Sequence, residues 1–356
     1  MISLFKSLKP HSDKEKTSRY THSAPPGWTP APEISHTHGQ YEDAPDNEYQ
    51  DGISFCLKYS LHRPALLPSY ITDQIQSQGA RAWGLEDPHT SRSSSTQYSP
   101  YSNRYRNRFS GKVQNISKDS KSGDPNVVRV TTTEKCKDFC ILSDLPIAAG
   151  LYDTFGRKGV YFEVMIHEMD APTSFITLGT ACKPYPTFRQ PGWNRESSGW
   201  HLDDLRKFFE DSDGGRDYTD NGRSLPLPWK YEAKSKSKSL YHSTTSESTQ
   251  TQFIPDGSII GCGYVFQTGT IFYTYNGLRL PNAFDGAHLP RGELDVYAAI
   301  GFCGRTRFDV NFGGETFKWL DGNTWEWRVE GIAGRLGSGM GESSGMAVDE
   351  LPPYSR

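Results

Sequence analysis

The sequence predicts an all-β fold: an antiparallel β-sandwich with a short N-terminal helix and disordered termini. Between residues 127 and 312, short runs of β-branched and aromatic residues alternate with turn residues, and no long segment repeats with the helical period. Aromatic residues make up 13% of the 356 residues, a share too large for a wholly disordered chain. Hydrophobic residues reach only 35%, so polar segments must accompany the folded part.

Eight short runs rich in Val, Ile, Phe and Tyr are predicted as strands. Residues 267–269 join two of them tightly, and Asn276 and Gly277 follow as residues that accept a positive φ. The predicted strands are residues 127–132, 159–166, 174–179, 199–202, 259–266, 270–275, 294–301 and 307–312.

One short helix is predicted between residues 64 and 86. Apolar side chains such as Ile71 and Ile75 recur there with helical spacing. Thr72 or Asp73 would cap its start and Gly79 would end it.

Composition divides the chain into a folded part and polar segments. After Leu8 the first 50 residues are almost without aliphatic side chains, which predicts a disordered arm, and Ser, Asn and Arg make a second weak stretch at 88–125. A Lys/Ser/Thr-rich segment between two strands is interpreted as a solvated loop insertion. The predicted organisation is an arm at 1–52, a folded domain with its lead-in at 53–328, the insertion at 231–252 and a flexible Gly/Ser tail at 329–356.

Charge and cysteine usage narrow the possible functions. With 39 Lys and Arg against 42 Asp and Glu, the formal charge of −3 gives no strong field for nucleic acid or an acidic membrane. Six cysteines without a CxxC pair predict reduced, mostly buried thiols rather than disulfides or zinc. We expect no secretory signal and no membrane span, because the most apolar window, 258–275, is broken by glycines and polar residues.

Catalytic, metal and cofactor sites are not expected. The histidines lack ligand spacing except His36 and His38 in the predicted arm, and the sequence has no GxSxG or phosphate-binding loop in a suitable context. The acidic run 210–217 fails the calcium-loop pattern, because Phe209 falls on the first ligand position. His201 with Asp203 and Asp204 could supply a general base, but no residue supplies a nucleophile.

Two segments resemble SPRY domains. Residues 260–277 resemble their signature hairpin, and residues 297–313 resemble their closing strands. Residues 180–194, 201–204 and 214–218 are similar to the fungal SPRY adaptors of endosomal and vacuolar protein sorting. The likeness covers about residues 64–319.

The resemblance implies a protein or peptide target bound by loops at one end of the sandwich, without a catalytic residue, cofactor or metal. Arg and aromatic side chains are frequent anchors at such surfaces. Trp193 has the alternative of packing in the core, as does Trp200. The residues expected at the partner surface are Tyr185, Phe188, Arg189, Pro191, Trp193, Asp203 and Arg216.

The resemblance also implies recruitment of a WW-domain HECT ubiquitin ligase. Family members of this type carry a membrane span and a PPxY motif, whereas this sequence has neither and ends instead in an LPxY variant: Leu351, Pro352, Pro353 and Tyr354. Such a Pro-containing segment is preorganised for a WW groove. We therefore expect a cytoplasmic adaptor that can be recruited to endosomal or vacuolar membranes. The alternative is a SPRY scaffold subunit of a cytosolic complex with an inert tail.

Two further patterns have plainer explanations. Leu67-Pro68-Ser69-Tyr70 also fits LPxY but lies inside the predicted folded part, where helix entry or burial is expected. Cations and aromatic residues interleave between Tyr101 and Lys121, as in single-strand binding surfaces. That cluster is short and the chain is negative overall, so we expect a solvated lead-in and no nucleic-acid partner.

Overall fold

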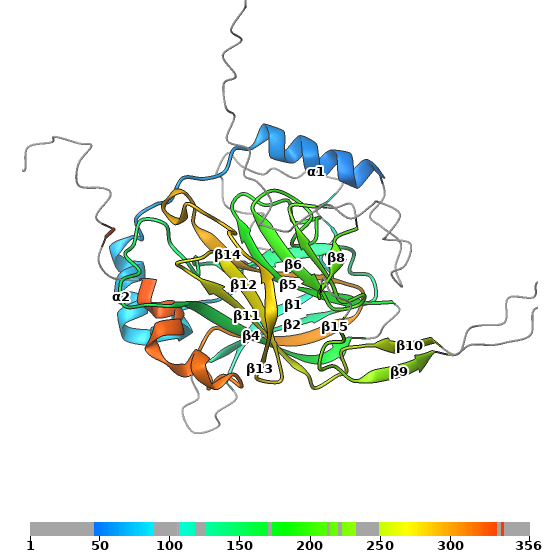
Figure 1. The fold of residues 1–356 in the computed structure, drawn as a ribbon. Coiled ribbons are helices and arrows are strands. Elements are labelled where there is room, and N and C mark those ends of the chain that lie inside the picture. Colours follow the sequence, from blue (N-terminus) through cyan, green and yellow to red (C-terminus); the bar gives the residue numbers. More distant parts are fainter. Residues whose placement is uncertain are drawn as a thin grey trace, which may run out of the picture.

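The computed structural model describes residues 46–88, 105, 107–117, 126–169, 173–211, 214–219, 223–232, 249–332 and 336–337. Two antiparallel sheets pack face to face, and α1 (Asp46–Lys58) lies over one end of the sandwich (Figure 1). Two antiparallel sheets packed face to face make this fold an antiparallel β-sandwich. Each sheet contains strands from distant parts of the sequence.

The larger sheet has seven strands in the order β1-β2-β15-β4-β11-β12-β13. Its central strand is β4, and in the neighbouring β11–β12 hairpin Gly263 pairs with Phe272. A Cβ on Gly263 would lie 2.2 Å from Cζ of the Phe272 ring, so the ring requires glycine at that position. The strands are β1 (Gly111–Ile116), β2 (Val127–Thr132), β4 (Gly159–Met169), β11 (Ile259–Val265), β12 (Thr270–Tyr275), β13 (Leu278–Phe284) and β15 (Thr306–Asn311).

The smaller sheet has six strands in the order β3-β14-β5-β6-β7-β8, and a separate hairpin pairs β9 with β10. The core lies between the two large sheets and contains fully buried side chains such as Phe162, Trp200 and Phe302. The strands are β3 (Phe139–Leu142), β5 (Phe175–Cys182), β6 (Ser197–His201), β7 (Arg206–Phe209), β8 (Arg216–Asp217), β9 (Trp229–Glu232), β10 (Thr249–Gln252) and β14 (Val296–Cys303).

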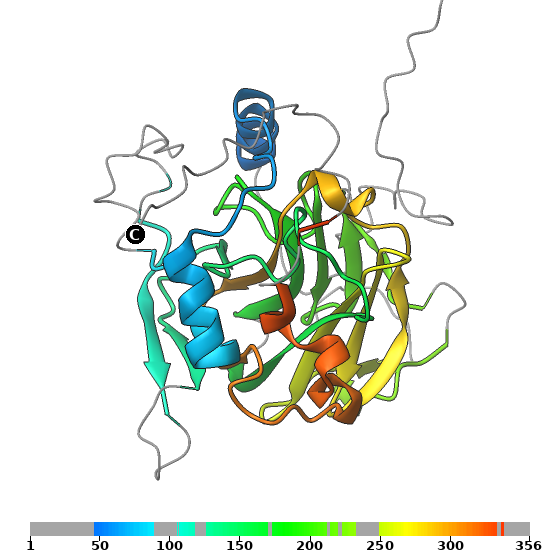
Figure 2. The same ribbon diagram turned by 90° about the vertical axis from the view of Figure 1, so that its left-hand side faces the viewer.

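Helices cover the outside of the sandwich. α2 (Ser69–Gln78) ends at Gly79, whose φ of 61° is easy only for glycine, and continues as the 3₁₀ helix η2 (Gly79–Ala82). Figure 2 shows α2 beside the β1–β2 edge and the C-terminal 3₁₀ helices in orange. These are η5 (Leu320–Asn323), η6 (Trp325–Trp327) and η7 (Val329–Ile332), and a further 3₁₀ helix, η4 (Arg291–Glu293), precedes β14.

The predicted all-β sandwich is confirmed, and all eight predicted strands coincide with observed ones within a few residues. The helix at 64–86 is also confirmed with its end at Gly79, although Pro68, not Thr72 or Asp73, occupies the position before its start. Trp200 packs in the core, as its alternative predicted.

Several elements were missed. α1 begins inside the predicted arm at Asp46, and β1 lies in the stretch 88–125, for which the polar composition predicts little regular structure. The ends of the predicted loop insertion at 231–252 pair as the β9–β10 hairpin. These segments are polar and their contacts are with distant parts of the chain, so local composition concealed them. Among the described residues, no helix combines the length and apolar character needed to cross a bilayer.

Candidate partner-binding surface

The predicted anchors lie mainly in the loop of residues 185–195, which connects β5 to β6. The structure brings them together but does not expose them. Arg189 is only 1% exposed, which is rare for a charged side chain. The anchors found in this loop are Tyr185, Phe188, Arg189 and Pro191, all buried, and Trp193, which is half-buried.

α1 is one of the elements that cover this 185–195 loop. A Cβ on Gly52 would lie 3.2 Å from Cδ of Arg189 and 3.3 Å from Nδ2 of Asn194, so the helix backbone rests directly on the loop. Arg195 Nη1 also donates to the carbonyl oxygen of Cys56, near the end of the helix. Glycine at position 52 therefore permits the close approach of α1 to the loop.

Charged and aromatic contacts extend the cover. Tyr105 stacks on Phe188 with ring centroids 3.9 Å apart and planes 8° apart, and its hydroxyl donates to Asp51 of α1. Arg108 forms a buried ion pair with Glu48 of the same helix. The loop is thus covered by α1 and by the segment that precedes β1.

Polar groups beneath this cover are incompletely paired. Arg189 Nε donates to Asn194 Oδ1 at 3.0 Å, and the guanidinium carbon lies 4.5 Å from the centroid of the Trp193 ring. Among the described residues, Nη1 of Arg189 and Nε1 of Trp193 have no hydrogen-bond partner. Burial lowers the pKa of Arg189. An unsatisfied buried donor costs about 1–3 kcal/mol, so each unpaired donor weakens the docking of α1 on the loop.

The other two predicted surface residues lie on different elements. Asp203 follows β6, and burial together with the negative charge of Asp204 raises its pKa well above the usual range. Arg216 lies in β8, paired in register with Lys207 of β7. Both residues therefore lie outside the 185–195 loop.

Arg206 holds the acidic run 210–217, which does not fit the calcium-loop pattern. Arg206 donates to the carbonyl oxygens of Gly214 and Gly215, and its guanidinium pairs with Asp217 at 3.1 Å. The described part of this run is a structural turn at the sheet edge.

Only one of the two LPxY matches lies within the described residues. Residues 351–354 lie outside the described residues. In the internal match, Pro68 immediately precedes α2 and Ile71 N donates to its carbonyl oxygen at 2.9 Å, so helix entry is confirmed there. Tyr70 on the first turn is 68% exposed.

Some residues of the cation-aromatic cluster between Tyr101 and Lys121 are buried in the fold. Tyr105, Arg108 and Phe109 are buried in contacts within the chain. Lys112 is exposed on β1. Tyr101, Arg104, Arg106, Lys118 and Lys121 lie outside the described residues.

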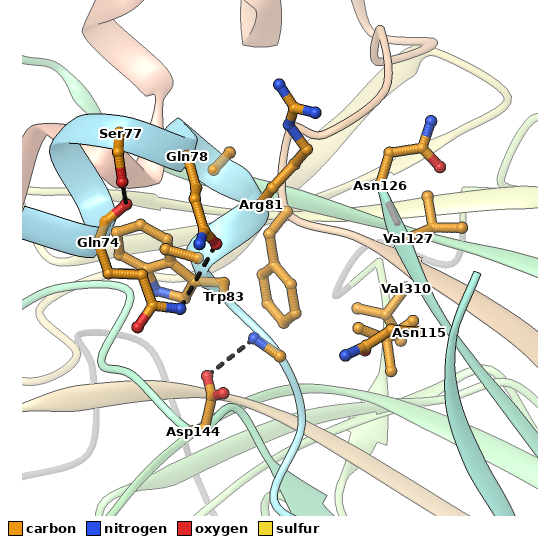
Figure 3. Close-up of a pocket in the computed structure, with 15 residues that line it drawn as sticks. Gln74, Ser77, Gln78, Arg81, Trp83, Asn115, Asn126, Val127, Asp144 and Val310 are labelled. Carbon is orange, nitrogen blue, oxygen red and sulfur yellow. Dashed lines mark hydrogen bonds between the residues drawn. The ribbon is translucent and has the colours of Figure 1, made fainter. Parts of the chain in front are cut away.

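Sequence reasoning missed a cavity of about 410 Å³ between α2–η2 and the β1–β2–β15 edge (Figure 3). Its polar lining includes Gln74, Gln78 and Asn126, while Val127 and Val310 supply apolar surface. Amide side chains of this kind can donate and accept hydrogen bonds from a peptide backbone. No periodic signal marks this cavity, because its lining comes from separate elements.

Sequence reasoning also missed a buried cluster of three potential metal ligands, Cys182, Glu196 and His288. Glu196 and His288 are 92 positions apart, so no motif spacing could reveal the cluster. The fold thus places His288 beside two potential ligands that lie far from it in the sequence.

Comparison with known proteins identifies the domain. Residues 210–315 match the family model of the SPRY domain. The chain contains a SPRY domain. The predicted resemblance is thereby confirmed, and the SPRY domain is a protein-interaction fold.

Curated relatives share this domain over part of their length. The protein ssh4 of Sclerotinia sclerotiorum is 28% identical over 197 residues, which cover 55% of this chain and 29% of that protein. A SPRY domain-containing protein of Schizosaccharomyces pombe is 27% identical over 49% of this chain and 36% of its own length. The matched segments are thus about a third or less of these relatives.

Two other matches are narrower or more distant. A dual specificity protein kinase of Dictyostelium discoideum is 32% identical over 38% of this chain but only 4% of the kinase. The crystal structure of a human SPRY domain aligns at 20% identity with a TM-score of 0.33, over 57% of this chain and 99% of that domain.

Proposed function

We propose that this chain is a non-enzymatic adaptor whose SPRY domain binds a protein target and whose tail recruits a WW-domain HECT ubiquitin ligase for endosomal or vacuolar sorting. The observation that carries the target-binding half is the 185–195 loop, which concentrates aromatic and Arg anchors beneath a cover that leaves donors unpaired. A target that supplied acceptors to Arg189 and Trp193 would satisfy groups that α1 does not. α1 is then a displaceable cover.

The ligase half rests on the sequence Leu351-Pro352-Pro353-Tyr354. The polyproline II conformation favoured by its prolines lowers the entropy lost on docking, and the Tyr ring fits a second pocket of a WW domain. Holding the ligase and the target on one chain raises their effective concentration for each other. Ubiquitin transfer would then be quasi-intramolecular.

Affinity purification of the full chain tests both halves. With Tyr354→Ala we expect at least about a tenfold loss of WW-domain ligase, since the ring supplies one of the two docking contacts, with target capture unchanged. Equal ligase recovery with both chains would refute the ligase half. A single stoichiometric partner that is retained after deletion of residues 347–356, without any ligase, would instead support a scaffold subunit.

Gly52→Leu tests the target half, because it changes α1 and leaves the loop intact. The added side chain would collide with Arg189 and Asn194. We expect increased target capture from the same lysate, with Leu57→Ala, an 83% exposed site on the same helix, as the matched control. Reduced capture with Gly52→Leu alone would show that α1 is part of the binding surface rather than its cover.

A further inference from the structure

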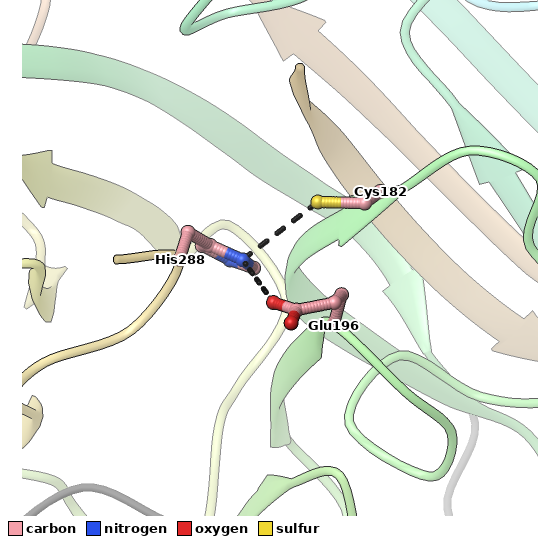
Figure 4. Close-up of side chains that lie close together, drawn as sticks. All are labelled: Cys182, Glu196 and His288. Carbon is pink, nitrogen blue, oxygen red and sulfur yellow. Dashed lines mark hydrogen bonds and ion pairs between the residues drawn. The ribbon is translucent and has the colours of Figure 1, made fainter. Parts of the chain in front are cut away.

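Three buried side chains from separate elements point at one spot inside the sandwich (Figure 4). Cys182 is the last residue of β5, Glu196 directly precedes β6, and His288 lies in the connection from β13 to β14. Their exposed fractions are 1%, 4% and 3%. One Sγ, one carboxylate oxygen and one ring nitrogen all lie within 4.8 Å of one another. Thiolate, carboxylate and imidazole are the ligands that zinc uses in proteins.

The separations suit ligands that share an ion better than they suit direct hydrogen bonds. His288 Nδ1 lies 3.3 Å from Glu196 Oε2 and 3.8 Å from Cys182 Sγ. A charge-assisted N–H···O bond is shorter, about 2.7–2.9 Å. With zinc bonds of about 2.0–2.3 Å and tetrahedral angles, neighbouring ligand atoms are roughly 3.3–3.6 Å apart. The observed distances lie close to that range.

The other nitrogen of His288 is already engaged. Nε2 lies 2.8 Å from Thr180 Oγ1, which in turn lies 2.7 Å from Ser198 Oγ. If Nε2 carries the proton and donates it to Thr180, then Nδ1 presents a lone pair to the sulfur and the carboxylate. In that tautomer the lone pair of Nδ1 faces the carboxylate of Glu196, and a cation between them would remove the repulsion. Metal-binding histidines commonly donate their second N–H in this way.

The backbone holds two of the three residues in an unusual conformation. Glu196 has a φ of 47° and His288 a φ of 53°, in the left-handed region that is uncommon for residues other than glycine. Tyr264 Oη donates to the carbonyl oxygen of Ala287 at 3.2 Å, and Glu210 accepts from the Glu196 N–H. Such conformations persist where surrounding contacts fix them and often mark functional positions.

The local charge favours a cation. The negative charges of Glu196, Asp295 and Glu210 act on the Cys182 thiol, and Arg195 supplies one opposing positive charge. We propose that Cys182, Glu196 and His288 bind a borderline-soft divalent ion of the Zn²⁺ type. On binding, Zn–S, Zn–O and Zn–N bonds form and the thiol releases its proton to solvent.

This site would fasten the base of the 185–195 loop. Cys182 and Glu196 stand on either side of that loop, and the backbone N–H of Cys182 donates to the Glu196 carbonyl oxygen at 2.9 Å. His288 adds a tie to the connection that follows β13 of the other sheet. The bound ion would hold the two ends of the loop in place whether or not α1 is displaced. This role does not depend on the identity of any partner.

Equilibrium dialysis of the full chain against Zn²⁺ alone, with metal analysis, tests the proposal. We expect one Zn²⁺ per chain, and with Co²⁺ a sulfur-to-metal charge-transfer band that reports the thiolate. His288→Asn removes the ligand while Asn tolerates the positive φ. We expect His288→Asn and Cys182→Ser each to weaken binding at least about 100-fold, and Thr180→Val about 10–100-fold as a lost outer partner.

The control is Cys140→Ser, which removes an equally buried thiol of β3 from outside the cluster and should bind Zn²⁺ like the unaltered chain. Circular dichroism of each variant reports whether it folds. If the two ligand variants do not fold, Thr180→Val still tests the site, because it retains all three ligands. Absence of stoichiometric Zn²⁺ on the unaltered chain would overturn the proposal, as would equal binding by His288→Asn and Cys140→Ser.

Discussion

Two covers of the sandwich differ in how they are attached: α1 over the 185–195 loop, and the η5–η6 segment over the outer face of the seven-stranded sheet. Under η5–η6, Trp319 packs 4.7 Å from Tyr161 and 5.1 Å from Trp327, between ring centroids. Glu163 is paired there, since it accepts hydrogen bonds from the Tyr161 hydroxyl and from the backbone N–H of Trp319, although Arg157 beside Trp325 keeps two nitrogens unpaired among the described residues. α1 instead docks through charged and polar contacts that leave donors unpaired. Apolar aromatic packing holds the η5–η6 segment, whereas polar contacts hold α1, which we propose can be displaced.

The largest effect should come from the fixed cover. Trp327→Ala would empty a 5% exposed position in the aromatic cluster, and we expect the free energy of unfolding to fall by about 3–5 kcal/mol. Urea denaturation measures it. The matched control is Trp325→Ala on the same 3₁₀ helix, a 60% exposed site where the change should stay within about 0.5 kcal/mol. Similar losses at both positions would mean that the cluster does not fasten this segment.

An intermediate effect is expected at the exchangeable cover. Overpacking by Gly52→Leu should cost about 1–3 kcal/mol of docking, seen as faster amide hydrogen exchange in residues 46–58. Exchange in η5 and η6 should not change, because that segment does not depend on α1. In the unaltered chain, too, amides of α1 should exchange before those of η5 and η6. The opposite order would invert the comparison of the two covers.

The smallest effect concerns the carboxyl group of Asp203. Its raised pKa means that the folded state holds this proton at pH values where the unfolded state, with a pKa of about 3.9, has lost it. Stability from this group is therefore lost as pH rises from 4 toward the folded pKa. Asp203→Asn, which stays neutral, should gain stability relative to the unaltered chain between pH 4 and pH 7. A urea midpoint difference that does not change with pH would contradict this.

The strands were predictable because their apolar runs are local. Residues 270–275 form a run of β-branched and aromatic residues with turn residues on either side, so local propensity already favours the strand that the structure contains. α1 was not predictable, since its sequence Asp46–Lys58 is polar and its docking depends on Arg189, Arg195 and Tyr105 far along the chain. The burial of Arg189 follows in part from the same long-range contact, whereas Tyr185 packs on Cys140 and Ala299 of the six-stranded sheet. Anchors of the right residue type were found, but their exposure could not be read from composition.

The β9–β10 hairpin has a practical consequence. Glu232 and Thr249 are paired in its register, so these two residues lie about 5 Å apart between Cα atoms. Changing the length between them adds little closure entropy. A fluorescent reporter placed within residues 233–248 would leave both chain ends untouched, and energy transfer from it to a dye on α1 could follow the cover in real time.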